Sequence, residues 1–184
     1  RLVSSTLEVF VSFPHRTEVC FNEFRSSAVD VDDGAWKFIK NNSHHGASKT
    51  GVMLVGKSFG GVKAWWFLRQ YWEWLREYEQ IGVLLVDPHG AIVGDGEIGP
   101  YGRGKDLVFD PRWRGVENFR LTNIYQRNEW PHGARFGVDE SNLIQKKCGS
   151  GVDHWNITDV GDSASSFVVD NLMDCLKWID RDHR

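Results

Sequence analysis

The sequence of residues 51–61 is GVMLVGKSFGG, and this stretch decides the fold expected for the rest of the chain. Large apolar residues, including two β-branched valines, fill positions 52–55, and such a run favours a buried strand. A strongly helical segment follows Gly61 directly. The segment between them, Gly56-Lys57-Ser58-Phe59-Gly60, therefore predicts a sharp turn from strand to helix with Ser58 at its apex.

The glycines on either side of Ser58 suit a turn of this kind. Gly56 and Gly60 lie two residues before and after the serine, where a Cβ atom would obstruct the close passage of the two arms. In this G-x-S-x-G context the segment resembles the nucleophile elbow of the α/β-hydrolase superfamily. The resemblance implies a serine hydrolase, similar to a small serine esterase or lipase, whose nucleophile is Ser58. It extends in element order from about Leu7 to the end of the chain, although only the elbow is a specific motif.

The same residues also match the phosphate-binding P-loop, because Gly51, Gly56, Lys57 and Ser58 have the spacing G-x-x-x-x-G-K-S. In a P-loop, the four residues between the glycines form a turn whose backbone N–H groups point at phosphate oxygens. Here those four residues are Val-Met-Leu-Val, and the preceding residues 41–50, NNSHHGASKT, do not resemble a strand. We therefore favour the hydrolase, with a P-loop nucleotide-binding protein as a lesser alternative.

Strands and helices alternate along the chain without repeats or an evident linker. Strands are expected at 7–13, 17–24, 51–55, 81–86 and near 119–125, and helices at 29–41, about 60–79 and from 162 or 163 to about 180. Alternation of this kind predicts an α/β fold, a three-layer sandwich with a mostly parallel central sheet and helices on both faces. Residues 1–184 are expected to form a single domain, a minimal α/β-hydrolase without a large lid.

The other catalytic residues are expected where strands end. In an open parallel sheet, functional groups gather beyond the carboxyl ends of the strands. Asp87 follows the apolar strand at 82–86, and His154 lies between the last expected strand and the C-terminal helix. Serine, acid and histidine then occur in the chain order that the superfamily uses for its catalytic triad. Glu129, which follows the strand containing Tyr125, is the substitute candidate for the acid.

These three residue types belong together because a serine hydroxyl becomes a good nucleophile only when an imidazole removes its proton. His154 would be that base, and Asp87 would hold its tautomer and stabilise the imidazolium. The resemblance places one oxyanion-hole donor at the backbone N–H of Phe59 and the second in the loop that begins at Phe13. We expect cleavage of a carboxylic ester or thioester through an acyl-enzyme, with no cofactor and no metal.

Two further alternatives remain, one for the function of the fold and one for the identity of the base. A catalytically inactive binding module on this fold would keep the core without a productive arrangement of Ser58 and His154. The histidines at 15, 89 and 132 compete with His154 for the role of base. His89 is only two residues from Asp87, so we expect it to be a loop residue.

Composition and charge narrow the class of partner. The formal net charge is −3, with 22 basic and 25 acidic residues spread along the chain, and this favours no nucleic-acid partner. The longest apolar runs are far too short to span a bilayer, so no transmembrane segment is expected, and no signal peptide is visible. Three cysteines cannot all pair within the chain, which favours a reducing compartment such as the cytoplasm. The expected partner is therefore a small-molecule or lipid acyl substrate, and the oligomeric state stays open.

Overall fold

The computed structural model describes residues 6–12, 20–25, 33–43, 46–47, 50–89, 107–128, 133–158 and 163–179. Within these ranges the chain forms a six-stranded sheet with the strand order β2-β1-β3-β4-β5-β6. The strands are β1 (Thr6–Ser12), β2 (Cys20–Arg25), β3 (Gly51–Lys57), β4 (Gln80–Val86), β5 (Phe119–Tyr125) and β6 (Leu143–Lys147). The helices are α1 (Asp33–Asn41), α2 (Phe59–Leu75) and α3 (Ser163–Ile179), with a short 3-10 helix η2 (Pro111–Trp113).

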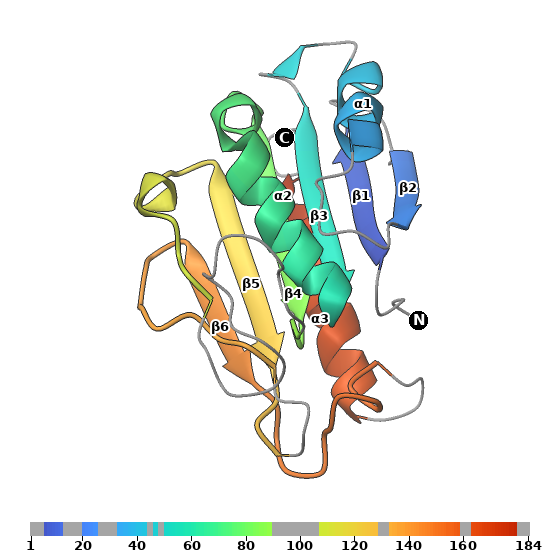
Figure 1. Ribbon diagram of the computed structural model, residues 1–184, viewed down its shortest axis with the longest axis vertical. Helices are drawn as coiled ribbons and strands as arrows, with labels where there is room; N and C mark the ends of the chain where they lie inside the picture. The colour runs from blue at the N-terminus through green and yellow to red at the C-terminus, as the bar shows by residue number, and fades with distance from the viewer. Residues whose placement is uncertain are drawn as a thin grey trace.

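The sheet is mostly parallel. Strands β3, β4, β5 and β6 run in one direction, whereas β1 pairs antiparallel with both β2 and β3. Figure 1 shows the four parallel strands with their carboxyl ends at the lower edge, where α2 begins. Residues that follow these strands therefore meet at one edge of the sheet, as the sequence predicts for the candidate site.

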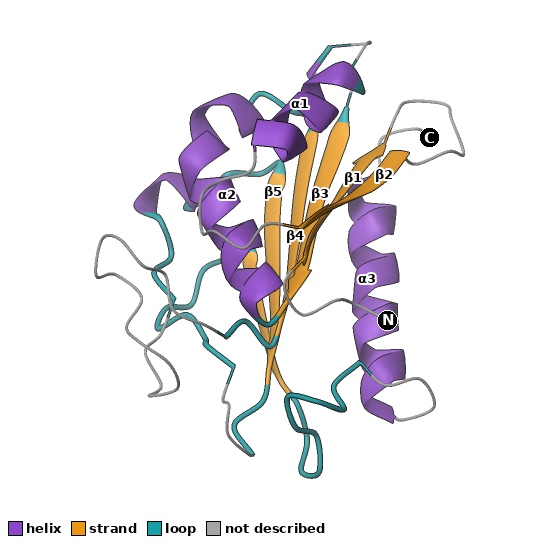
Figure 2. Cartoon of the chain, turned by 45° about the vertical axis from the view of Figure 1, so that its right-hand side comes forward, coloured by secondary structure: helices purple, strands orange, loops and turns teal. Residues whose placement is uncertain are grey.

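Helices cover both faces of the sheet, with α1 and α2 on one face and α3 on the other (Figure 2). Because side chains alternate along a strand, β3 contributes to two cores. Val52 and Leu54 pack in the core beneath α2, and Met53 and Val55 pack in the core beneath α3. Burial on both faces explains the continuous apolar sequences of β3 and β4. The predicted three-layer α/β sandwich is confirmed.

Strand β6 is a strand that the sequence does not predict. Its sequence is LIQKK, and its residues are half-buried or exposed. It lies at the edge of the sheet and pairs only with β5 among the described strands. Edge strands carry polar side chains more readily than central strands do, so a search for apolar alternation passes over this one.

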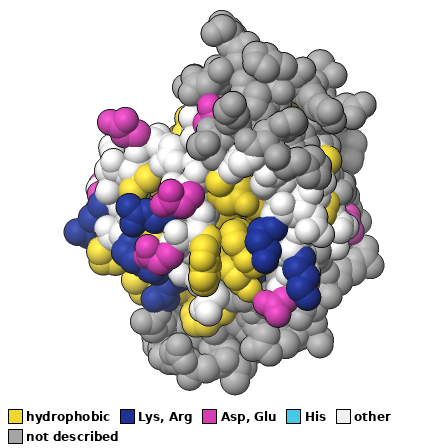
Figure 3. All heavy atoms as spheres, turned by 90° about the horizontal axis from the view of Figure 1, so that it is seen from above, with side chains coloured by type: hydrophobic (Ala, Val, Ile, Leu, Met, Phe, Trp, Pro, Cys, Tyr) yellow, Lys and Arg dark blue, Asp and Glu magenta, His cyan; other side chains and the backbone are white. Residues whose placement is uncertain are grey.

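Helix α2 buries a stripe of large side chains and exposes aromatic rings near its end. Trp65 and Trp72 are fully buried against the sheet, whereas Trp74 is 56% exposed. The ring of Trp36 in α1 stacks on that of Tyr71, with centroids 5.2 Å apart, and lies 6.0 Å from that of Trp74. Figure 3 shows hydrophobic side chains gathered between charged groups at this end of the molecule. Across the described helices, no segment is long and apolar enough to cross a membrane.

Candidate active site

Ser58 occupies the turn between β3 and α2 with φ 55° and ψ −123°. A positive φ is unfavourable for a residue with a Cβ atom, so the surroundings must enforce it. The Ser58 N–H donates to the carbonyl of Val86 at 2.9 Å, and the Ser58 carbonyl accepts from the N–H groups of Gly61 at 3.0 Å and His89 at 3.1 Å. The end of β4 and the loop after it therefore hold the backbone of Ser58 through both its N–H and its carbonyl group.

Two glycines of the turn, Gly56 and Gly61, lie where a Cβ atom would be crowded, as the sequence predicts for them. A Cβ atom at Gly56 would collide with the backbone of Gly60 and would lie 2.6 Å from the nitrogen of Gly61. A Cβ atom at Gly61 would lie 3.0 Å from both the Gly56 oxygen and the Pro88 Cβ atom. The start of α2 thus passes so close to β3 that a side chain at Gly56 would force the backbone apart, and one at Gly61 would be tightly crowded.

The residues that match the P-loop spacing lie in a strand. The whole interval Gly51–Lys57 belongs to β3, which pairs with β1 on one side and with β4 on the other. The backbone N–H groups that a P-loop would direct at phosphate are therefore part of the sheet.

Asp87 follows β4 directly and also has a positive φ, 46°. In the described part of the chain, Ser58 and Asp87 are the two non-glycine residues with this backbone strain. Strain of this kind is concentrated at functional sites. The Asp87 side chain is fully buried, and its Oδ1 atom accepts a hydrogen bond from the backbone N–H of Gln126 at 3.0 Å. The Gln126 side-chain amide donates to Oδ2 at 3.3 Å.

His154 completes a buried pair with Asp87. Its Nδ1 atom lies 2.6 Å from Asp87 Oδ2, and the residue is only 3% exposed. When the carboxylate is ionised, Nδ1–H is the donor, and Nε2 is left as the acceptor on the other side of the ring. The structure thus brings Asp87 and His154 together. The Ser58 hydroxyl makes no hydrogen bond to the described residues, which leaves it available to a substrate.

Two contacts connect the serine turn to the histidine. Lys57, which precedes Ser58, is 3% exposed, and its Nζ atom donates to Thr158 Oγ1 at 2.9 Å. His89, whose backbone bonds to Ser58, places its ring edge-to-face with that of His154, with centroids 5.6 Å apart. The turn that carries Ser58 and the loop that carries His154 are therefore joined at the carboxyl edge of the sheet.

The loop that carries the imidazole is held by its own hydrogen bonds. Asp153 Oδ1 accepts from the backbone N–H groups of Trp155 at 2.7 Å and Asn156 at 2.8 Å. Asn156 Oδ1 in turn accepts from the backbone N–H of Asp153 at 2.8 Å. Asn128, from the loop after β5, donates to the carbonyl of Val152 at 2.8 Å. These bonds fix the loop together with Ile157, which is fully buried in the core beneath α3.

Three residues near Asp87 are absent from the sequence-based site. Gln126 is fully buried and provides two donors to the carboxylate. A Cβ atom at Gly133 would collide with Asp87 Oδ1 and would lie 2.9 Å from its Cγ atom. Burial raises the pKa of the Cys148 thiol to about 11, and the negative charge of Asp87 adds to this. Gln126 and Cys148 directly follow β5 and β6, so the rule of strand ends could have found them.

Several predicted site residues lie outside the described residues. These are Phe13, the expected second oxyanion donor, Glu129, the substitute acid, and the competing histidines at 15 and 132. Phe59 is the first residue of α2, and N–H groups in the first turn of a helix have no acceptor within the helix. His89 lies in a loop, as expected, and its ring also contacts the candidate base.

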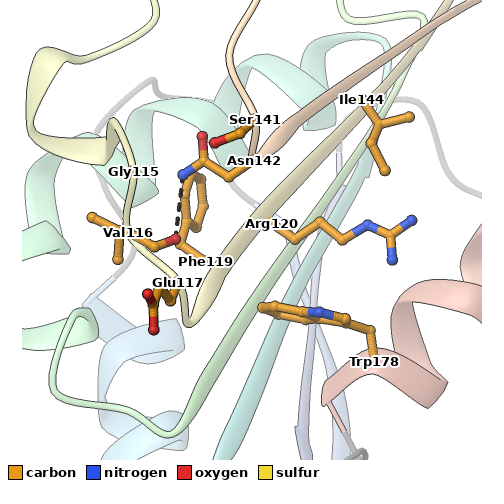
Figure 4. A pocket seen from close by; sticks show the side chains of 9 residues that line it. All are labelled: Gly115, Val116, Glu117, Phe119, Arg120, Ser141, Asn142, Ile144 and Trp178. Atoms are coloured by element: carbon orange, nitrogen blue, oxygen red, sulfur yellow. Dashed lines mark hydrogen bonds between the residues drawn. The ribbon is translucent and has the colours of Figure 1, made fainter.

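A separate cavity of about 350 Å³ lies at the amino ends of β5 and β6, next to α3 (Figure 4). Arg120 and Trp178 line it, and none of the candidate triad residues does. Among the described residues, no group of three or more His, Cys, Asp or Glu side chains could hold a metal ion.

Comparisons with models of protein families, with curated proteins and with solved structures find no match to this chain. The α/β sheet and the arrangement of side chains around Ser58 are therefore the basis for a functional proposal.

Proposed function

We propose that this protein is a serine hydrolase of the α/β-hydrolase type that cleaves a carboxylic ester or thioester through an acyl-enzyme on Ser58. The observation that carries the proposal is the buried contact of 2.6 Å between His154 Nδ1 and Asp87 Oδ2. This pair adjoins a strand-to-helix turn whose serine has a positive φ. A nucleophile, a base and an orienting acid are the three parts that acyl transfer requires.

In the first half of the reaction, His154 Nε2 takes the proton of Ser58 Oγ while this oxygen bonds to the carbonyl carbon of the substrate. The tetrahedral intermediate then collapses, the bond from the carbonyl carbon to the leaving oxygen or sulfur breaks, and His154 returns the proton to that atom. In the second half, a water molecule gives a proton to His154 and attacks the acyl carbon, and Ser58 leaves with the proton. Ester and water become acid and alcohol, and the enzyme is regenerated.

Asp87 has two tasks in this scheme, to hold the imidazole and to stabilise its protonated form. The two donors from Gln126 keep the carboxylate in place, at 3.0 and 3.3 Å from its oxygens. The negative oxygen of the intermediate needs fixed donors as well. The backbone N–H of Phe59, at the start of α2, is the first, and we retain the Phe13 backbone as the expected second.

An inactive binding module is the competing proposal from another class. A fully buried carboxylate costs several kcal/mol in desolvation, roughly, unless partners compensate it. Asp87 is completely buried, and the hydrogen bonds described for its carboxylate are to His154 and Gln126. A module that only binds ligands needs no such pair beside a strained serine, so the enzyme is favoured.

Replacing Ser58 by alanine tests the proposal. Removal of the nucleophile of a serine protease lowers turnover by on the order of 10⁶-fold, and we expect hydrolysis of p-nitrophenyl acetate to fall to the background rate. Ser141→Ala, at an exposed serine outside the site, is the matched control and should keep parental activity. If the alanine variant at position 58 is folded by circular dichroism and hydrolyses the ester at the parental rate, Ser58 is not the nucleophile. A parent without activity above background would favour the binding module.

A further inference from the structure

We infer that Trp155 determines substrate specificity, because its exposed ring is placed to bind an aromatic or bulky apolar group on the leaving alcohol. The inference rests on the proposed function and deepens it by naming the part of the ester that the enzyme selects.

Trp155 presents a large apolar surface to solvent next to the candidate base. It is 65% exposed, the highest value among the exposed large hydrophobic side chains of the described residues. Its ring meets that of His154 edge-to-face, with centroids 5.2 Å apart and an interplanar angle of 87°. A single exposed tryptophan is unremarkable by itself, but the ring of this one contacts the candidate base.

The backbone of Trp155 is fixed although its side chain is not buried. Its N–H donates to Asp153 Oδ1 at 2.7 Å, and Asn156 Nδ2 donates to the carbonyl of Gly151 at 3.0 Å in the same loop. The contact between Lys57 and Thr158 holds the end of this loop against β3. Since little backbone freedom is left to lose, binding a ligand to this ring costs little conformational entropy.

The chemistry of the reaction decides which part of the ester reaches the ring. His154 must give its proton to the leaving oxygen, so the substituent on that oxygen lies close to the side chains that pack on the imidazole. Among the described aromatic rings, those of His89, with a centroid separation of 5.6 Å, and Trp155 lie against it. His89 is half-buried and polar, whereas Trp155 offers an open apolar face. The acyl substituent extends from the carbonyl carbon bonded to Ser58, so selection acts on the alcohol and not on the acid.

The test compares benzyl acetate with ethyl acetate, which share the acyl group and differ in the alcohol. We expect Trp155→Ala to lower the ratio of kcat/KM for benzyl acetate to that for ethyl acetate by roughly twofold to tenfold, the range expected of one aromatic contact. Trp155→Phe should keep most of the ratio. Ethyl phenylacetate, which carries its ring on the acyl side, should show no such loss relative to ethyl acetate.

Trp74→Ala is the matched control. Trp74 is similarly exposed, at 56%, but it lies near the end of α2, about 24 Å along the helix from Ser58. Its replacement should leave all three rates unchanged.

The outcomes separate this inference from the proposed function. An unchanged benzyl-to-ethyl ratio in Trp155→Ala overturns the inference, and so does an equal loss on all three esters, which would mean that Trp155 only positions His154. If a fluorophosphonate still labels Ser58 in the parent, the proposed function survives either result. If the parent neither reacts with this probe nor hydrolyses any of the esters, the proposed function fails and the inference fails with it.

Discussion

Replacing Gly133 by alanine would test how strongly activity depends on the position of the Asp87 carboxylate. The added Cβ atom would collide with Asp87 Oδ1 and would lie 2.9 Å from its Cγ atom and 3.1 Å from the Tyr125 Cβ atom. Gly133 has no positive φ, so alanine meets no backbone strain at this position. The contact with the carboxylate is therefore the main consequence of the substitution.

The size of the effect can be estimated from these distances. Ordinary van der Waals contact begins at 3.4 Å, so Asp87 Cγ must move by about half an ångström, and Oδ1 must move farther. A misplacement of about 1 Å in a catalytic group can cost roughly 10²-fold in rate. Loss of the oriented acid in a serine protease costs about 10⁴-fold. We therefore predict that kcat/KM falls by between roughly 10² and 10⁴.

The assay is steady-state hydrolysis of p-nitrophenyl acetate, with thermal unfolding measured in parallel. Gly149→Ala is the matched control, since a Cβ atom there would meet nothing within 4 Å, and it should behave as the parent does. A folded Gly133→Ala variant with parental kcat/KM would show that the carboxylate can move without consequence, which would refute the role given to Asp87.

Three other predictions concern Asp87, the Cys148 thiol and the ion pair of Asp110 with Arg112. Asp87→Asn should lower turnover by about 10⁴-fold, whereas Glu129→Gln should be nearly neutral, and kinetics with the reverse ranking would move the acid to the later position. Cys148 should resist iodoacetamide in the native protein at neutral pH, because burial raises the pKa of its thiol from 9.0 to about 11, and mass spectrometry should find it alkylated only near that pH or after unfolding. Burial acts to raise the pKa of Asp110, but hydrogen bonds from Arg112 and nearby positive charges lower it overall. The ionised Asp110 therefore stabilises the folded protein when the pH is above 3.8, the usual pKa. This stabilisation is lost as the pH falls through the lowered pKa of the folded state. Arg112→Ala should therefore reduce the free energy of unfolding by about 1 kcal/mol at neutral pH, and a difference of equal size in strong acid would contradict this cause.

The central elements of the fold could be predicted because burial leaves a clear pattern. Strands β3 and β4 are buried on both faces, so their apolar runs are continuous, and the turn at Ser58 is defined by glycines that the close approach of α2 requires. The edge strand β6 is partly exposed and includes two lysines, so it has no continuous apolar run by which a strand could be predicted.

Part of the candidate site could also be predicted, because parallel strands bring their carboxyl ends to one edge. Ser58 and Asp87 follow the adjacent strands β3 and β4, so both lie at that edge. The roles of Gln126 and Gly133 depend on contacts with the Asp87 carboxylate from a different segment. No periodicity or spacing within one segment encodes such a contact, so only the structure reveals it.

The most direct measurement is the identity of the residue that a fluorophosphonate modifies, determined by intact mass and peptide mapping. We predict one phosphonyl group per chain, attached to Ser58, with fluoride as the leaving group. Ser58→Ala should not react, and His154→Ala should react far more slowly than the parent, because its serine has lost the base. Modification at another residue, or undiminished modification of the Ser58→Ala variant, would contradict the assignment of Ser58 as the nucleophile.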